Sequence, residues 1–122
     1  MAGLPKWLTE SDVRAKLSVP KEWWDIIIRP LFGDELDRRR EIELWAVDGV
    51  GMFWEFRCAV RQKGRYKKPV LQSDGWLKFV NYKGLGVGDM VILDTVENQF
   101  RGTRFLLRAC KYDADGQCWF DV

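Results

Sequence analysis

The sequence predicts a mainly β fold in which about seven short strands form an open or closed barrel, with two helices inserted between them. Apolar and polar residues alternate along several short segments, and turn residues such as Gly and Asp separate these segments. The 122 residues suit one hydrophobic core, so we expect a single domain over residues 1–122. Seven Trp, seven Phe and three Tyr side chains can fill a small barrel without disulfides or a metal.

The expected strands are apolar runs bounded by turns. The clearest pair is residues 42–47 and 53–60, because Asp48-Gly49 and Gly51 between them are typical of a hairpin. In the second strand Trp54, Phe56 and Cys58 share one face, which we expect to be buried. Pro20 marks the edge or end of a strand that contains Leu17 and Val19. The other expected strands cover residues 4–8, 69–72, 90–93, 105–109 and 119–122.

Two segments have the spacing of helices. Residues 21–31 carry apolar side chains three and four positions apart, and Pro30 with Gly33 is expected to close this helix. Residues 33–41 are read as a charged connection, and residues 9–16 as a polar segment. A second short helix is expected at residues 76–82, with Trp76, Phe79 and Val80 on one side.

The composition disfavours an enzyme. The chain has no His, so no His-based triad, His general base or His metal ligand can form. Cys58, Cys110 and Cys118 show no CxxC spacing, which argues against a disulfide framework or a zinc knuckle, and Cys58 fits a small core residue. The N-terminus lacks the apolar run of a signal peptide, and no apolar stretch approaches the ~20 residues that span a bilayer. We therefore expect a soluble, intracellular protein without a membrane partner.

The positive charge of the chain is local. Residues 57–68 contain six basic residues and no acidic one, whereas the rest of the chain contains 14 basic and all 18 acidic residues. Guanidinium groups, an amide, a Gly and an aromatic ring alternate in residues 61–66, a mixture that suits phosphate contacts and base-edge hydrogen bonds. A solvated loop kept soluble by its charges would look the same. Arg14 and Lys16 form a second, weaker basic segment.

Two other clusters fit turns better than sites. Gly84, Gly86 and Gly88 lack the Lys-Ser or Lys-Thr of a phosphate loop, and Asp89 would repel phosphate, so Asp89 is expected to cap a turn. The carboxylates near residues 113–121 lie around a Gly turn and not in a shared apolar pocket. We expect no cofactor, no metal and no small-molecule substrate.

Four motifs in a fixed order resemble the plant B3 DNA-binding domain. They are Leu8-Thr9-Glu10-Ser11-Asp12-Val13, Leu17-x-Val19-Pro20-Lys21, Gly75-Trp76-x-x-Phe79-Val80 and Leu85-x-x-Gly88-Asp89. The resemblance covers about residues 7–111, and the last two motifs are its most specific part. The long segment over residues 22–40, with its double Trp, is most similar to divergent small B3 proteins that stand alone.

The resemblance implies a seven-stranded open pseudobarrel with two short helices, and two arms that straddle the DNA major groove. The first arm follows the first strand, and the second lies between the fourth and fifth strands. Both arms coincide with the two basic segments found from charge alone. The implied DNA-binding residues are Ser11, Arg14, Lys16 and Ser18 in the first arm, and Arg61, Gln62, Lys63, Arg65, Tyr66, Lys67 and Lys68 in the second.

We therefore expect a nuclear, sequence-specific binder of double-stranded DNA that acts in transcription regulation, with other transcription regulators as a second class of partner. The alternative is a B3-like module that has lost base reading and binds proteins through exposed aromatic residues such as Trp23 or Trp24. Basic residues gathered on one concave face would favour DNA, and a flat apolar patch around the two Trp residues would favour a protein partner. Only a deep pocket with facing carboxylates would favour an enzyme.

Overall fold

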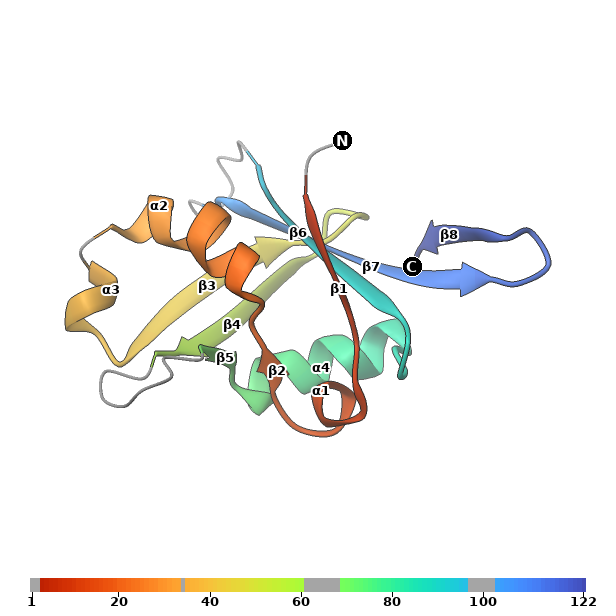
Figure 1. Ribbon diagram of the computed structural model, residues 1–122, viewed down its shortest axis with the longest axis horizontal. Helices are drawn as coiled ribbons and strands as arrows, with labels where there is room; N and C mark the ends of the chain where they lie inside the picture. The colour runs from red at the N-terminus through yellow and green to blue at the C-terminus, as the bar shows by residue number, and fades with distance from the viewer. Residues whose placement is uncertain (1–2, 34, 61–68, 97–102) are drawn as a thin grey trace.

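The computed structural model describes residues 3–33, 35–60, 69–96 and 103–122. One curled sheet surrounds the core, and short helices lie across its openings (Figure 1). In chain order the elements are β1 (Leu4–Trp7), α1 (Glu10–Arg14), β2 (Leu17–Ser18), the π-helical η1 (Trp23–Ile28), α2 (Arg29–Phe32), α3 (Glu35–Arg38), β3 (Glu41–Val47), β4 (Phe53–Ala59), β5 (Val70–Leu71), α4 (Ser73–Lys83), β6 (Met90–Thr95), β7 (Phe105–Asp113) and β8 (Cys118–Asp121).

Seven strands form one continuous path, in the order β1-β6-β7-β3-β4-β5-β2, and β8 pairs with β7 beside that path. The β3–β7 pair is parallel and the other pairs are antiparallel. The end strands β1 and β2 share no ladder in the described residues, so the barrel is open. The Nζ of Lys6 in β1 donates to the carbonyl oxygen of Ser18 in β2 and bridges this opening. The predicted open pseudobarrel is confirmed, and β8, which lies beside the seven-strand path, falls on the strand expected at residues 119–122.

The helices differ from the prediction in three places. The segment after Pro20 is helical through Phe32, but its middle is π-helical, and the amide of Arg29 donates to the carbonyl of Trp24 five residues back. Pro30 does not close this segment. It occupies the first turn of α2, where a missing N–H costs little, and Gly33 ends the helix with φ 58. The expected non-helical segments at residues 9–16 and 33–41 contain α1 and α3.

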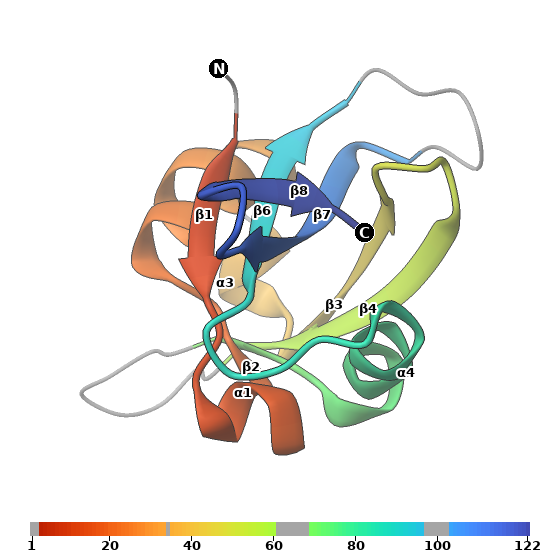
Figure 2. The ribbon, with the colours of Figure 1, turned by 90° about the vertical axis from the view of Figure 1, so that its right-hand side faces the viewer.

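The core fills the inside of the curl. Phe79 of α4 lies at the centre of an aromatic cluster, with ring centroids 5.0 Å from Trp54, 5.7 Å from Phe56 and 5.8 Å from Trp76. These contacts hold α4 against β4, while η1 packs against β6 on another side of the interior (Figure 2). The predicted buried face of β4 is confirmed for Phe56 and Cys58, which are buried, and Trp54 on the same face is half-buried and packs against the core.

Candidate nucleic-acid interface

The first predicted arm contains a short helix with a defined start. The hydroxyl of Thr9 accepts a hydrogen bond from the amide of Asp12 at 3.3 Å, and the Asp12 carboxylate accepts one from the Thr9 amide at 2.9 Å. This reciprocal pair is a capping box, which satisfies two amides that the first turn of a helix leaves without partners. The arm therefore leaves β1 in a fixed direction.

Asp12 holds both ends of the first arm. Its side chain is 1% exposed and accepts hydrogen bonds from the Ser18 amide and the Lys6 ammonium, both at 3.2 Å, in addition to the Thr9 amide. Burial raises the pKa of the Asp12 carboxyl, but these amides and the ammonium outweigh it and hold the pKa below its ordinary value. A single buried carboxylate thus ties Thr9 to Ser18 across the arm.

The predicted DNA-binding residues of the first arm are exposed. Ser11, Arg14, Lys16 and Ser18 all face solvent. The guanidinium of Arg14 forms an ion pair with Glu10 at 2.8 Å, and its side chain is 74% exposed. Lys16 forms no ion pair within the described part of the chain. Exposed pairs four positions apart on a helix contribute only about 0.3–0.5 kcal/mol, so Arg14 remains available to another anion.

The second predicted arm falls on residues that the structure does not describe. Arg61, Gln62, Lys63, Arg65, Tyr66, Lys67 and Lys68 all lie in that segment, between residues 60 and 69. Its two ends are described. Ala59 at the end of β4 lies opposite Val70 in β5, and the amide of Val60 donates to the carbonyl of Arg40 at 2.7 Å. The chain therefore leaves and re-enters the sheet at adjacent positions.

The ends of the two arms meet in one ladder. Ser18 lies opposite Val70 and Leu17 lies opposite Leu71, while the Val19 amide donates to the Pro69 carbonyl at 3.0 Å. Each arm directly precedes its strand, and β2 and β5 run antiparallel. The described ends of the two arms, Ser18 in β2 and Val70 in β5, therefore lie opposite each other in this two-residue ladder (Figure 1).

The Gly75-Trp76 motif supports the first arm from below. The indole N–H of Trp76 donates to the backbone carbonyl of Asp12 at 2.6 Å, and the Trp76 side chain is fully buried. A Cβ at position 75 would lie 2.3 Å from the carbonyl oxygen of Glu55. Only Gly therefore allows α4 to approach β4 this closely, and that approach places the indole beneath α1.

The Gly88-Asp89 motif holds the residue that precedes the first arm. The Leu8 amide donates to the Asp89 carbonyl at 2.8 Å, and the Gly88 amide donates to the Leu8 carbonyl at 2.9 Å. The Asp89 carboxylate accepts from the Gly86 amide at 2.8 Å, which confirms its expected role in the turn. Lys111 also pairs with this carboxylate at 2.7 Å. Both specific motifs thus act on the position of the first arm.

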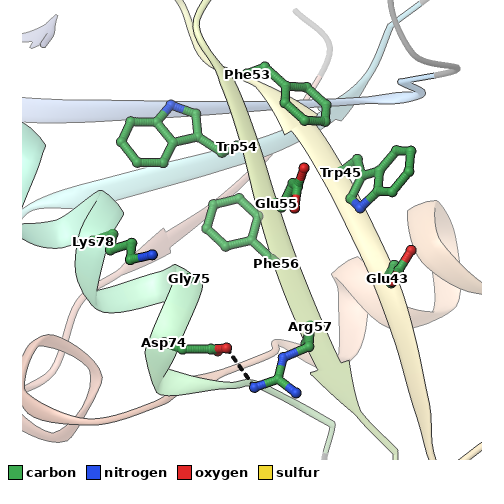
Figure 3. A pocket seen from close by; sticks show the side chains of 10 residues that line it. All are labelled: Glu43, Trp45, Phe53, Trp54, Glu55, Phe56, Arg57, Asp74, Gly75 and Lys78. Atoms are coloured by element: carbon green, nitrogen blue, oxygen red, sulfur yellow. Dashed lines mark hydrogen bonds and ion pairs between the residues drawn. The ribbon is translucent and has the colours of Figure 1, made fainter.

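A surface pocket lies beside the start of α4, over β3 and β4 (Figure 3). Its lining includes two aromatic and five charged side chains, those of Trp45, Phe53, Glu43, Glu55, Arg57, Asp74 and Lys78. A catalytic acid needs a raised pKa, but the Gly75 amide and the Arg57 guanidinium lower the pKa of Asp74. The charged side chains of the lining are exposed, so this pocket lacks the desolvated carboxylates that the enzyme interpretation requires.

The described residues offer no metal site and no membrane span. No group of three His, Cys, Asp or Glu side chains gathers in this part of the chain. None of its helices is long and apolar enough to cross a bilayer. Burial raises the pKa of the Cys58 thiol to about 12, as expected of a core residue and not of a reactive thiol.

The aromatic patch expected for a protein-interaction module is absent from the Trp23 region. Trp23 is 1% exposed, and its indole N–H donates to the Leu4 carbonyl at 2.7 Å. Trp24 is half-buried and packs against the core. The alternative of a protein-interaction module therefore finds no flat exposed patch at these two residues, because the helical segment turns them inward.

The open pseudobarrel and the adjacent arm ends define a class of fold that known proteins share. A family model described as B3 DNA binding domain matches residues 6–112. A solved structure titled "Arabidopsis FUS3-DNA complex" has a TM-score of 0.67 and 21% sequence identity, over 90% of this chain and 97% of that chain. No curated protein sequence matches. The chain belongs to the B3 DNA binding domain family, which is a family of DNA-binding domains and not of enzymes.

Proposed function

We propose that this chain binds double-stranded DNA sequence-specifically, in the nucleus and in transcription regulation, with both arms in the major groove. Its family and the DNA complex of a protein with the same fold support this function. The observation that carries the two-arm mechanism is the short β2–β5 ladder, in which Ser18 lies opposite Val70. Two arms that enter the sheet one ladder apart can reach the same stretch of duplex.

The distribution of charge supports the same surface. Arg57 forms ion pairs with two carboxylates, those of Asp74 and Glu41, so its charge is balanced locally. Five basic residues remain within residues 61–68, without an acidic residue among them. Arg14 and Lys16 add exposed positive charge at the other end of the ladder. A double helix carries dense negative charge, which such a pair of basic arms attracts.

The residue types divide the contacts into two kinds. Lys63, Lys67 and Lys68 would meet phosphates and set the register on the duplex. Arg residues pair with guanine and Gln with adenine through two hydrogen bonds each, which suits Arg14, Arg61, Gln62 and Arg65 for base edges. Ser11, Ser18, Lys16 and Tyr66 would contribute further contacts at the margins of the groove. About five phosphate contacts give a log-log salt slope of about −4 to −5.

Titrations of labelled duplexes at several stated salt concentrations test this function. Arg65→Ala should weaken binding to the preferred duplex by about 1–3 kcal/mol and relax the preference at one base pair. Lys67→Ala is the matched control, because it should weaken binding to all duplexes alike and reduce the magnitude of the salt slope by about one. If Arg65→Ala binds every duplex as the unaltered chain does, the second arm does not read bases.

A further inference from the structure

Three strands, β1, β2 and β8, pair with a single neighbour within the described part of the sheet, and the outer edges of β1 and β2 are protected. In β1, Pro5 lacks an N–H and the Leu4 carbonyl accepts from the Trp23 indole. The edge of β2 is only two residues long, and its Ser18 carbonyl accepts from Lys6. Short strands, Pro and Lys are the usual means by which proteins keep sheet edges from pairing with other chains.

The third edge, β8, has neither Pro nor Lys, and its one charged residue, Asp121, is paired with Arg108. Its four residues are all exposed and include no Lys, Arg or Pro. Trp119 is 37% exposed and Phe120 is 46% exposed, and Tyr112 on the adjacent strand is 51% exposed. The β7–β8 hairpin extends from the body of the sheet, away from α1 and β2 (Figure 1). Most of it lies beyond residue 112, where the family match ends.

We infer that β8 is a self-association edge, which pairs antiparallel with β8 of a second copy of this chain about a twofold axis at Trp119. Residues that lie opposite each other in a ladder share a face. In one copy Tyr112 lies opposite Trp119, with ring centroids 5.4 Å apart. Pairing two copies at Trp119 would therefore line up four aromatic rings across four strands on one face.

The charges of the hairpin favour a second copy over DNA. From Gly116 to Phe120 the edge carries no charge, so no like charges meet when two copies pair at Trp119. In that register Cys118 lies opposite Phe120, and Gln117 lies opposite Asp121. A nucleic acid would instead meet the carboxylates of Asp113 and Asp115 beside the edge. A self-complementary edge also gives the isologous interface that closed dimers use.

The association should be concentration-dependent, because a four-residue ladder buries less area than a stable dimer needs. Sedimentation of the full chain in reducing buffer should show a weight-average mass that rises from 14.3 kDa toward twice that value with concentration. Trp119→Lys and Trp119→Glu should each stay monomeric, since each variant places like charges opposite each other. An equal mixture of the two variants should regain association, which a folding defect would not do.

Ile26→Lys is the matched control. Ile26 is an apolar residue of η1 that is 62% exposed, so this variant adds the same charge away from β8 and should associate as the unaltered chain does. The inference is overturned if the unaltered chain stays monomeric at every concentration. It is also overturned if Trp119→Lys associates as strongly as the unaltered chain, or if the mixture of opposite charges does not associate.

Discussion

Ser18 lies directly opposite Val70 in the two-residue ladder that joins β2 to β5. Each residue lies two positions after the last basic residue of its arm, although Ser18 and Val70 are more than fifty positions apart in the sequence. The ladder fixes the distance between the ends of the two arms. The contacts of the sequence motifs also position this part of the sheet, because most of them are made to the first arm.

Removal of the acidic partner of Arg14 should strengthen DNA binding. Glu10 lies 2.8 Å from the Arg14 guanidinium and is 65% exposed on the same face of the arm. Glu10→Gln frees that guanidinium and removes a charge that repels phosphate, so affinity at low salt should rise a few-fold. Titrations of Glu10→Gln and Arg14→Ala on one duplex check this, and the two variants should change affinity in opposite directions. Unchanged affinity in Glu10→Gln would contradict the approach of the first arm to the duplex.

A side chain at position 75 should destabilise the fold. The Cβ of Gly75→Ala would lie 2.3 Å from the Glu55 carbonyl oxygen, so α4 must shift away from β4 at a cost of about 1–3 kcal/mol. Gly86→Ala is the matched control, since its Cβ meets nothing closer than 3.9 Å and should change stability by less than about 0.5 kcal/mol. Urea unfolding measures both. Equal stability of the two variants would contradict the close approach of α4.

The Asp12 carboxylate should make the free energy of unfolding depend on pH in the acidic range. Its pKa in the folded chain lies below the value of about 3.9 in the unfolded chain, so its stabilisation is present above pH 4 and is lost as the pH falls through the lower folded pKa. Asp12→Asn should be less stable than the unaltered chain at pH 7, and the difference should shrink as the pH falls below 4. Urea unfolding at a series of pH values checks this. A difference that stays constant with pH would mean that Asp12 does not act through its charge.

The buried ion pair between Asp48 and Lys83 should be needed for stability. Both side chains are nearly inaccessible to solvent and lie 2.9 Å apart, and the Trp54 indole and two backbone amides also donate to Asp48. Lys83→Met leaves the Asp48 charge buried without a counter-ion, at an expected cost of about 3–5 kcal/mol. The double variant with Asp48→Asn should lose less than the sum of the single losses. Additive losses in a double-mutant cycle would show that the two charges do not interact.

Most of the fold follows from local pattern. Alternation in β3 and β4 predicts their hairpin and the buried face with Phe56, because a half-buried antiparallel pair repeats every two residues. The helical spacing of Trp76 and Phe79 likewise predicts α4. The capping box that starts α1 also has a signal in the sequence, because Thr9 and Asp12 have the spacing of that motif. The expected polar segment at residues 9–16 did not include this helix, since the third helical position of a capping box is more often Glu or Gln than Asp.

The supports of the candidate site depend on contacts that no local pattern contains. Lys6 and Asp12 are not among the predicted site residues, yet they join β1, α1 and β2. The hydrogen bond from Trp76 to the Asp12 carbonyl joins residues 64 positions apart. The motif predicts that both residues matter, but their contact depends on how the sheet curls. The π-helical turn at Trp23–Ile28 could not be predicted from the sequence either, because its apolar spacing also fits an α-helix.

Selection from a pool of random duplexes at stated salt tests the two-arm mechanism most directly. The unaltered chain should select one continuous motif, whereas Arg14→Ala and Arg65→Ala should each lose preference at different base pairs within it. Such a result places both arms on one duplex, side by side. Selection of no motif, or of one that neither variant alters, would contradict the proposal that the two arms read DNA together.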